Sequence, residues 1–177
     1  MVTLQALEVG DRESFILDCQ EAFFCDHTSV SGADAEEARQ DEAASGEEII
    51  PRALLEKALE RSEAYRLVSD GEVCGGLVLR VRGERGELEF LFVSPQLHSK
   101  GLGFEAWCLV EKLHPEVRVW ETLTPYFLKR NIHFYVNRCG FHIVEFFHER
   151  HPMPQVVSGE KPWEVDMLRF EKVMSGH

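Results

Sequence analysis

The stretch from Leu88 to Val110 constrains this chain most, because it joins a strand pattern to a helix pattern through a glycine-rich loop. Its first six residues are apolar except for Glu89, and its last part has the periodicity of an amphipathic helix. Between them lies Lys100-Gly101-Leu102-Gly103. Glycines at a helix start let backbone N–H groups face an anion, because no Cβ atom holds the anion away. The loop therefore indicates a phosphate site, and a turn without any ligand is the alternative.

Length and charge limit the function classes. A chain of 177 residues is most simply one domain spanning 1–177, with a polar acidic insertion at about 26–48. The formal net charge of -12 argues against a nucleic-acid partner or an anionic membrane surface, which are bound by basic patches. It suits a cationic acceptor. Many of the acidic residues lie in Asp34–Glu48, however. The alternative is that this acidic segment only keeps the protein soluble and binds no cation.

Cysteine usage and hydropathy favour the cytoplasm. The five cysteines include no C-x-x-C pair, so neither a disulfide framework nor a thiolate zinc site is expected. No signal-peptide pattern opens the chain, and no apolar run reaches the roughly 18 residues of a membrane span. The spacing of His142, His148 and His151 matches no metal site, so no metal is predicted.

Local patterns predict a first strand at Val2–Val9, a helix burying Phe15, Cys19, Ala22 and Phe23, and a second helix from Pro51 to about Arg61. Turn sequences then separate three strands of an antiparallel meander, Ala64–Ser69, Val73–Val81 and Glu87–Val93. The segment at 26–48 is too polar to bury much apolar surface, so it is helical in part, a mobile loop over a pocket or an inert insertion.

The second half alternates helices and strands. A helix follows Gly103 and stops at Pro115, and a strand at Val117–Trp120 makes a crossover that predicts parallel pairing with Phe90–Val93. Thr124-Pro125 is expected to open a fourth helix that Gly140 ends. The last two strands are expected at Phe141–Phe147 and Val165–Lys172. No internal repeat is visible.

This order of elements resembles the GNAT acetyltransferase superfamily, and two signatures carry the resemblance. The first is V-x-x-x-x-[Q/R]-x-x-G-x-[G/A], here Val93-Ser94-Pro95-Gln96-Leu97-His98-Ser99-Lys100-Gly101-Leu102-Gly103. The second is F-Y-x-x-x-G-F, which this chain carries with one further residue before the glycine, as Phe134-Tyr135-Val136-Asn137-Arg138-Cys139-Gly140-Phe141. One departure is His98, which stands at the glutamine or arginine position. The resemblance implies an α/β (α+β) fold with a mixed, mostly antiparallel twisted sheet of about seven strands. Helices are expected on both faces, and a parallel strand pair at the acetyl-CoA cleft.

The resemblance also implies a co-substrate and the residues that bind it. The expected co-substrate is acetyl-CoA, with Phe92 and Val93 pairing with its pantetheine arm. Asn131 would reach the same arm, and Tyr135, at i, i+4 from it, would stand near the sulfur. The pyrophosphate would lie among His98, Ser99, Lys100, Gly101, Leu102, Gly103 and Phe104.

The expected acid is Tyr135, whose hydroxyl can give a proton to a departing thiolate, and a core tyrosine without a role is the alternative. The expected base is Glu87 or Glu89, which share one face of a strand by period-two alternation. Glu87 lies 11 residues before His98 and matches a glutamate that some family members use through water. A solvent-exposed, inert role for one of them is the alternative.

The resemblance implies a cytoplasmic N-acetyltransferase that acetylates a primary amine of a small molecule or peptide by direct attack, possibly as a homodimer. A polyamine, an aminoglycoside and a peptide amine are candidate acceptors. The acceptor pocket would be built by about Phe23–Pro51 and Glu149–Trp163. A catalytically silent domain that binds acyl-CoA as a sensor or partner-binding module is the alternative function. A dinucleotide fingerprint at Gly101-x-Gly103-x-x-Ala106 is disfavoured, because seven residues separate it from its strand.

Overall fold

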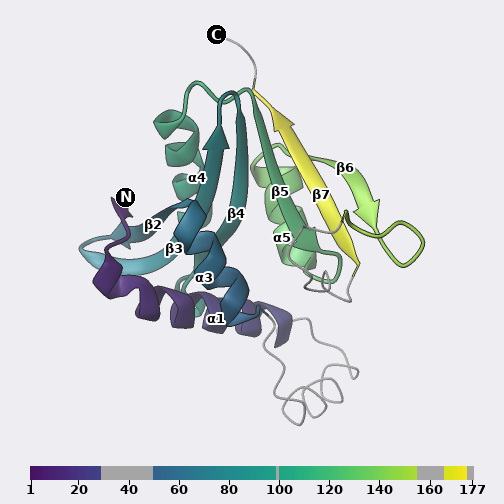
Figure 1. Cartoon of the computed structure of the whole chain (residues 1–177). Helices are drawn as coiled ribbons and strands as arrows, with labels where there is room; N and C mark the ends of the chain where they lie inside the picture. The colour runs from purple at the N-terminus through teal and green to yellow at the C-terminus, as the bar shows by residue number, and fades with distance from the viewer. Residues whose placement is uncertain (29–49, 99, 155–165, 175–177) are drawn as a thin grey trace.

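A seven-stranded sheet in the order β1-β2-β3-β4-β5-β7-β6 forms the frame of the protein (Figure 1), within the residues that the computed structural model describes, 1–28, 50–98, 100–154 and 166–174. The strands are β1 Val2–Ala6, β2 Glu63–Ser69, β3 Glu72–Arg82, β4 Arg85–Val93, β5 Val119–Pro125, β6 His142–Phe147 and β7 Met167–Val173. The helices are α1 Arg12–Thr28, α3 Arg52–Arg61, α4 Leu102–Leu113 and α5 Lys129–His133, the last continuing as a π-helix, Phe134–Arg138. Short 3-10 turns lie at Val9–Asp11 and Pro95–Leu97.

All neighbouring strands are antiparallel except β4 and β5, which run parallel. Their pairing is short: Arg85–Leu88 of β4 faces Val119–Thr122 of β5. Beyond Leu88 and Thr122 the two strands part, and Figure 1 shows them separating toward the lower part of the view. We call this divergence the fork. The second half of β4 therefore offers backbone groups on one side that β5 does not use.

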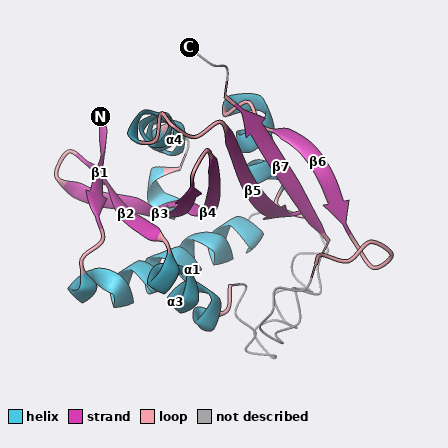
Figure 2. Cartoon of the chain, turned by 45° about the horizontal axis from the view of Figure 1, so that its top comes forward, coloured by secondary structure: helices cyan, strands magenta, loops and turns pink. Residues whose placement is uncertain are grey.

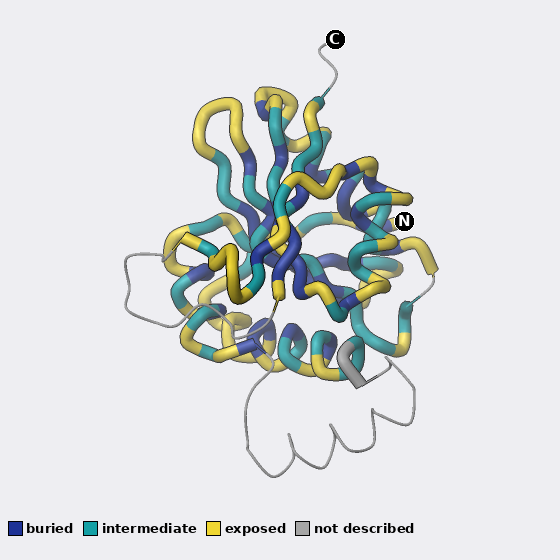
Figure 3. The backbone as a smooth tube through the Cα atoms, turned by 90° about the vertical axis from the view of Figure 1, so that its right-hand side faces the viewer, coloured by how far each residue is buried: buried dark blue, intermediate teal, exposed yellow. Residues whose placement is uncertain are grey.

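Two apolar clusters cover opposite faces of the sheet. Helices α1 and α3 pack on one face, around Phe15, Leu55 and Phe92. Helix α4 and the π-helix pack on the other, around Trp107, Trp120 and Phe141. Figure 2 shows the helices on either side of the sheet, and Figure 3 shows the buried segments gathered in the middle of the molecule. The predicted fold class, a mostly antiparallel mixed sheet with helices on both faces, is confirmed.

Two details predicted for this region are wrong. The parallel pairing with β5 involves Arg85–Leu88 of β4 rather than Phe90–Val93, and one predicted helix start is misplaced. Thr124 and Pro125 do not open a helix; they end β5, paired with Leu168 and Met167 of β7, and the helix begins at Lys129. A proline has no N–H to give to a sheet, but Pro125 lies past the fork, where β5 no longer pairs with β4. Helix α1 also continues through Thr28, into the start of the predicted insertion, and the remainder of that insertion lies outside the described residues.

A β-bulge interrupts β4 at Glu89, because Phe90 pairs with Val78 of β3 while Leu88 pairs with the next residue, Leu79. Strict alternation would put Leu88 and Phe90 on one face. Instead Leu88 belongs to the α4 cluster and Phe90 to the α1–α3 cluster. The bulge thus turns Phe90 to the face of the sheet that α1 and α3 cover, immediately before the fork opens.

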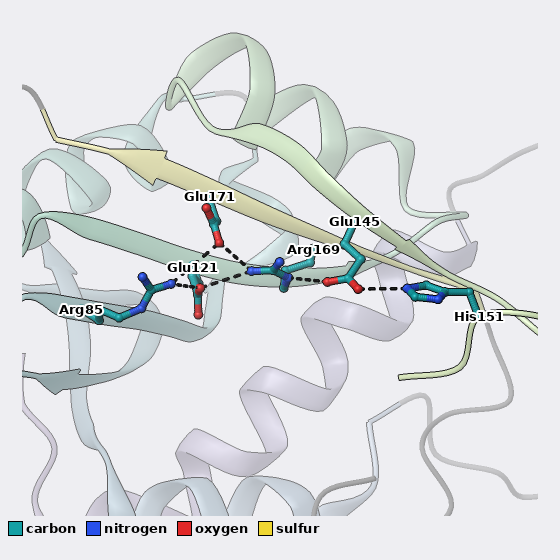
Figure 4. Close-up of polar contacts among 6 residues, drawn as sticks. All are labelled: Arg85, Glu121, Glu145, His151, Arg169 and Glu171. Carbon is teal, nitrogen blue, oxygen red and sulfur yellow. Dashed lines mark hydrogen bonds and ion pairs between the residues drawn. The ribbon is translucent and has the colours of Figure 1, made fainter. Parts of the chain in front are cut away.

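Charged side chains join the strands on both sides of the fork (Figure 4). Arg85 of β4 pairs with Glu121 of β5, and Glu121 lies 3.2 Å from the Arg169 guanidinium of β7. Arg169 also pairs with Glu145 of β6 at 2.9 Å, whose carboxylate contacts the His151 ring at 2.9 Å. We call this row, together with Glu171, the charged ladder. None of the described helices is both long and apolar enough to cross a membrane.

Candidate active site at the fork

The glycine loop lies beside a cavity of about 250 Å³, here called the loop cavity. Its wall combines the end of β4, the start of α4 and the helical segment after β5; the lining residues are Asp26, Leu91, Phe92, Val93, Leu97, His98, Gly101, Leu102, Gly103, Phe104, Arg130, Asn131, His133, Phe134 and Arg138. Gly101 is the N-cap of α4 in a left-handed conformation, with φ of 80°. The first N–H groups of α4 have no acceptor within the helix, so they are available to an anion in this cavity.

Two arginines give the loop cavity a positive lining that the sequence motifs did not indicate. The Arg138 guanidinium lies 5.4 Å from the centroid of the Phe104 ring, at the start of α4. Arg130 lies 3.0 Å from the Asp26 carboxylate and donates to Nδ1 of His98. Both arginines lie near the glycine loop in a protein whose net charge is -12. The cavity therefore suits an anionic ligand, although the protein as a whole is negatively charged.

His98, which replaces the glutamine or arginine of the first signature, is held by the protein itself. Its Nε2 lies 2.8 Å from the Val93 carbonyl oxygen, and its Nδ1 receives the Arg130 N–H, which fixes the neutral tautomer with the proton on Nε2. The ring thus fastens the loop to the end of β4. Lys100 is exposed, and Ser99 lies outside the described residues.

A second cavity of about 210 Å³ contains both predicted carboxylates, and we call it the carboxylate cavity. Leu91 and Asn131 line both cavities, so the two meet at the fork. The second cavity takes residues from both faces of the sheet: Phe23 of α1 and Leu54 of α3 on one side, and Tyr135 of the π-helix on the other. It therefore passes through the opening between β4 and β5.

Glu89 is the more enclosed of the two carboxylates, with its side chain 5% exposed. Its Oε1 accepts the Ser62 hydroxyl at 3.0 Å and lies 3.6 Å from the Arg61 guanidinium and 3.5 Å from that of Arg80. Burial raises its pKa above the usual glutamate value, against the opposing effect of Arg61. The raised pKa and the enclosure of its side chain make Glu89 a candidate proton acceptor.

Glu87 lines the same cavity and pairs with Arg80, but its side chain is 36% exposed. Arg80 thus joins Glu87 and Glu89, and this contact fits the predicted shared face of the strand. The inert alternative suits Glu87 better than Glu89, because the Glu87 side chain is the more exposed of the two.

Tyr135 is buried, 6% exposed, against the rings of Phe141 and Phe170 at centroid separations of 5.5 and 5.7 Å. Burial raises the pKa of its hydroxyl, and a hydrogen bond with Thr122 opposes this in part. The group therefore stays protonated at neutral pH, as a proton donor must. Thr122 also donates from Oγ1 to the Leu88 carbonyl oxygen at 2.9 Å, so one side chain joins β4, β5 and Tyr135 where the fork opens.

Comparison with known proteins identifies the group to which this arrangement belongs. A model of the Acetyltransferase (GNAT) family matches residues 30–141. The chain belongs to the GNAT family of acetyltransferases. The resemblance drawn from the two signatures is thereby confirmed.

Solved GNAT structures share the fold over nearly the whole chain. One is a GNAT family acetyltransferase from Elizabethkingia anophelis with acetyl-CoA bound, at a TM-score of 0.65 and 15% identity, covering 98% of each chain. Another is a Bacillus subtilis acetyltransferase in complex with CoA, at a TM-score of 0.62 and 19% identity, also covering 98% of each chain.

A relative in sequence is the uncharacterised protein YrkN of Bacillus subtilis, which is 44% identical over 118 residues. The match covers 62% of this chain and 64% of that protein.

Proposed function

We propose that this GNAT protein transfers the acetyl group of acetyl-CoA to a primary amine by direct attack in a ternary complex. The observation that carries the proposal is that the loop cavity and the carboxylate cavity meet at the fork, at Leu91 and Asn131. An anion-binding loop thus lies on one side of the junction, and a proton acceptor and a proton donor line the other. Structures of the same fold hold acetyl-CoA or CoA, which supports this use of the loop cavity.

The loop cavity fits the charged part of acetyl-CoA. The N–H groups at the start of α4 receive the pyrophosphate, and Arg130 and Arg138 balance its charge. The unpaired side of β4, around Phe92 and Val93, faces the pantetheine arm. His98 takes one lone pair of the Val93 carbonyl oxygen, and the second stays available. Acetyl-CoA, when bound, supplies the thioester carbonyl that the amine attacks.

Glu89 and Tyr135 carry two of the three proton transfers. Glu89 accepts a proton from the acceptor ammonium, so that the neutral amine can form the new C–N bond. The nitrogen of that bond then gives its second proton to solvent in the open cavity. As the C–S bond breaks, Tyr135 gives its hydroxyl proton to the departing thiolate. Asn131, which lines both cavities, lies where the acetyl group passes from one to the other. Proton exchange with solvent through the open carboxylate cavity restores both side chains.

The test is a primary-amine panel with acetyl-CoA, read as free CoA thiol and as acetylated product. Tyr135→Phe should lower kcat by about 100-fold or more while the acetyl-CoA Kd changes less than about twofold. Glu89→Gln should lower kcat/KM by about 100-fold, and the matched variant Glu87→Gln by less than about tenfold. Full turnover in Tyr135→Phe, or equal losses in the two glutamine variants, would contradict the assigned roles.

A second candidate function is a catalytically silent domain that binds acyl-CoA as a sensor or partner-binding module. It is favoured by one observation, that both carboxylates are already paired with arginines. The same experiment separates the two functions. Acetyl-CoA binding with no product from any amine would select the silent module.

A further inference from the structure

The carboxylate cavity has an apolar body and one charged end. Its apolar wall comes from several elements and includes Phe23, Ile50, Leu54, Leu123, Met153 and Met167. The charged residues among those that line it in the described chain are Glu87, Glu89 and Arg61, which lie together on β4 and at the end of α3. A ligand in this cavity thus meets charge at one end, and the rest of the described lining is apolar except for Thr124, Asn131 and Tyr135.

The charges at that end already balance. Glu89 pairs with Arg61 and Arg80, and Glu87 pairs with Arg80, so two carboxylates face two guanidinium groups. A first ammonium gains the Glu89 carboxylate as proton acceptor. A second ammonium a few carbons away would lie along the mostly apolar wall, where the described lining offers it no carboxylate, so its desolvation would not be offset by an ion pair.

Because the carboxylate cavity has one charged end and a mostly apolar wall, we infer that the acceptor is a small primary amine with a single positive charge and an apolar body, such as an alkylamine or an arylalkylamine. The inference rests on the proposed amine acetylation. It disfavours polyamines, which the net charge of -12 alone would favour. The cavity of about 210 Å³ suits a small body, since drug-sized ligands occupy pockets of roughly 300–1,000 Å³.

Hexylamine and 1,6-diaminohexane form a matched pair for the test, because they differ only in the second ammonium. With acetyl-CoA and wild-type protein, kcat/KM for hexylamine should exceed that for 1,6-diaminohexane by about tenfold or more. Leu123 lies on the apolar wall and is 38% exposed, so a longer polar side chain can be placed there without disturbing the core. Leu123→Glu should raise kcat/KM for the diamine relative to hexylamine, whereas the neutral, similarly shaped Leu123→Gln should not.

Three results would overturn the inference. Equal or better use of 1,6-diaminohexane by the wild type contradicts it directly. Acetylation of spermidine or a peptide amine without acetylation of hexylamine contradicts it while leaving the proposed function intact. Absence of product from every amine in the panel, with acetyl-CoA still bound, removes both the inference and amine acetylation.

Discussion

Among the single residues of the site, Thr122 connects β4 to the helical segment that carries Tyr135. Its hydroxyl donates to the Leu88 carbonyl of β4 and lies in hydrogen-bond contact with Tyr135, and the side chain is 3% exposed. A buried carbonyl that loses its donor retains the full cost of desolvation. We therefore expect Thr122 to act as a positioning residue that holds the fork at its origin, beside the Tyr135 hydroxyl.

Replacing Thr122 by Val, which keeps the shape and removes the hydroxyl, should destabilise the protein by about 1–3 kcal/mol, or lower Tm by about 2–4 °C per kcal/mol. Thr122→Ser, which retains the hydroxyl, should recover most of kcat even if some packing is lost. Calorimetry and acetyl-transfer kinetics measure the two effects. A Thr122→Ser variant as slow as Thr122→Val would mean that the residue only packs.

The site residues differ in how far the sequence could locate them. Gly101 and Tyr135 lie in local signatures, so reading the chain was enough to find them. Arg130 lies outside both signatures, and Arg138 stands at a position of the second signature where no residue type is specified, so neither had such a signal. Both reach the glycine loop only after the segment that follows β5 has folded across the fork. Spacing alone could not separate these two arginines from solvated charges.

At the element scale, the close packing of β3 on the end of β4 supports the fork. A Cβ atom on Gly75 would lie 2.2 Å from the Phe92 carbonyl oxygen, and one on Gly76 would lie 2.3 Å from the Phe15 ring. Only glycine leaves room for β4 to stay at this distance while its other side parts from β5. Packing against β3 thus fixes the position of the β4 backbone beside the loop cavity.

Gly75→Ala should destabilise the protein by about 1–3 kcal/mol, because the added methyl group meets backbone that cannot move aside. It should also weaken acetyl-CoA binding by displacing the end of β4. The matched control is Gly10→Ala, where an added Cβ meets no atom within 4 Å and Tm should be nearly unchanged. Thermal unfolding and acetyl-CoA titration of both variants measure the two effects. Equal Tm values for Gly75→Ala and Gly10→Ala would show that β3 accommodates the added methyl group without a loss of stability.

Elements with strong local patterns were predictable, and those set by long-range pairing were not. Glycine turns and alternation located the meander of β2, β3 and β4. The sequence suggested a helix at Thr124-Pro125 because a cap residue before a proline is a typical helix start, yet pairing with β7 extends β5 through both residues. The bulge at Glu89 leaves no trace in the apolar pattern, since it is defined by the register of β3 against β4.

At the scale of the whole molecule, the sheet consists of two parts that a short parallel pairing joins. One part is β1 to β4, the other is β5, β7 and β6, and four residues of each of β4 and β5 pair between them. The ion pair between Arg85 and Glu121 crosses the same seam, and the charged ladder continues from Glu121 to Arg169 and Glu145 within the second part (Figure 4). Because the fork is the gap between the two parts, their relative position sets the width of the site.

Arg169→Met should lower stability at neutral pH by about 1 kcal/mol, because three ion pairs of the partly exposed ladder are lost. His151 and Arg169 hold the pKa of Glu145 below the ordinary value of 4.5, so its contribution is present above that value and is lost as pH falls through the lowered pKa. The Tm difference between wild type and variant should therefore shrink at low pH. A difference that stays constant with pH would assign the effect to packing.

Isothermal titration with Gly101 variants tests directly whether the loop cavity holds the pyrophosphate of acetyl-CoA. Gly101 has φ of 80°, and an added Cβ meets no atom within 4 Å, so Asn and Asp, which tolerate this conformation better than other residues, both fit. They have the same shape and differ in charge. Gly101→Asn should keep the wild-type Kd within about tenfold, and Gly101→Asp should bind at least about tenfold more weakly than Gly101→Asn. Equal affinity of the two variants, or no binding by the wild type, would contradict the account.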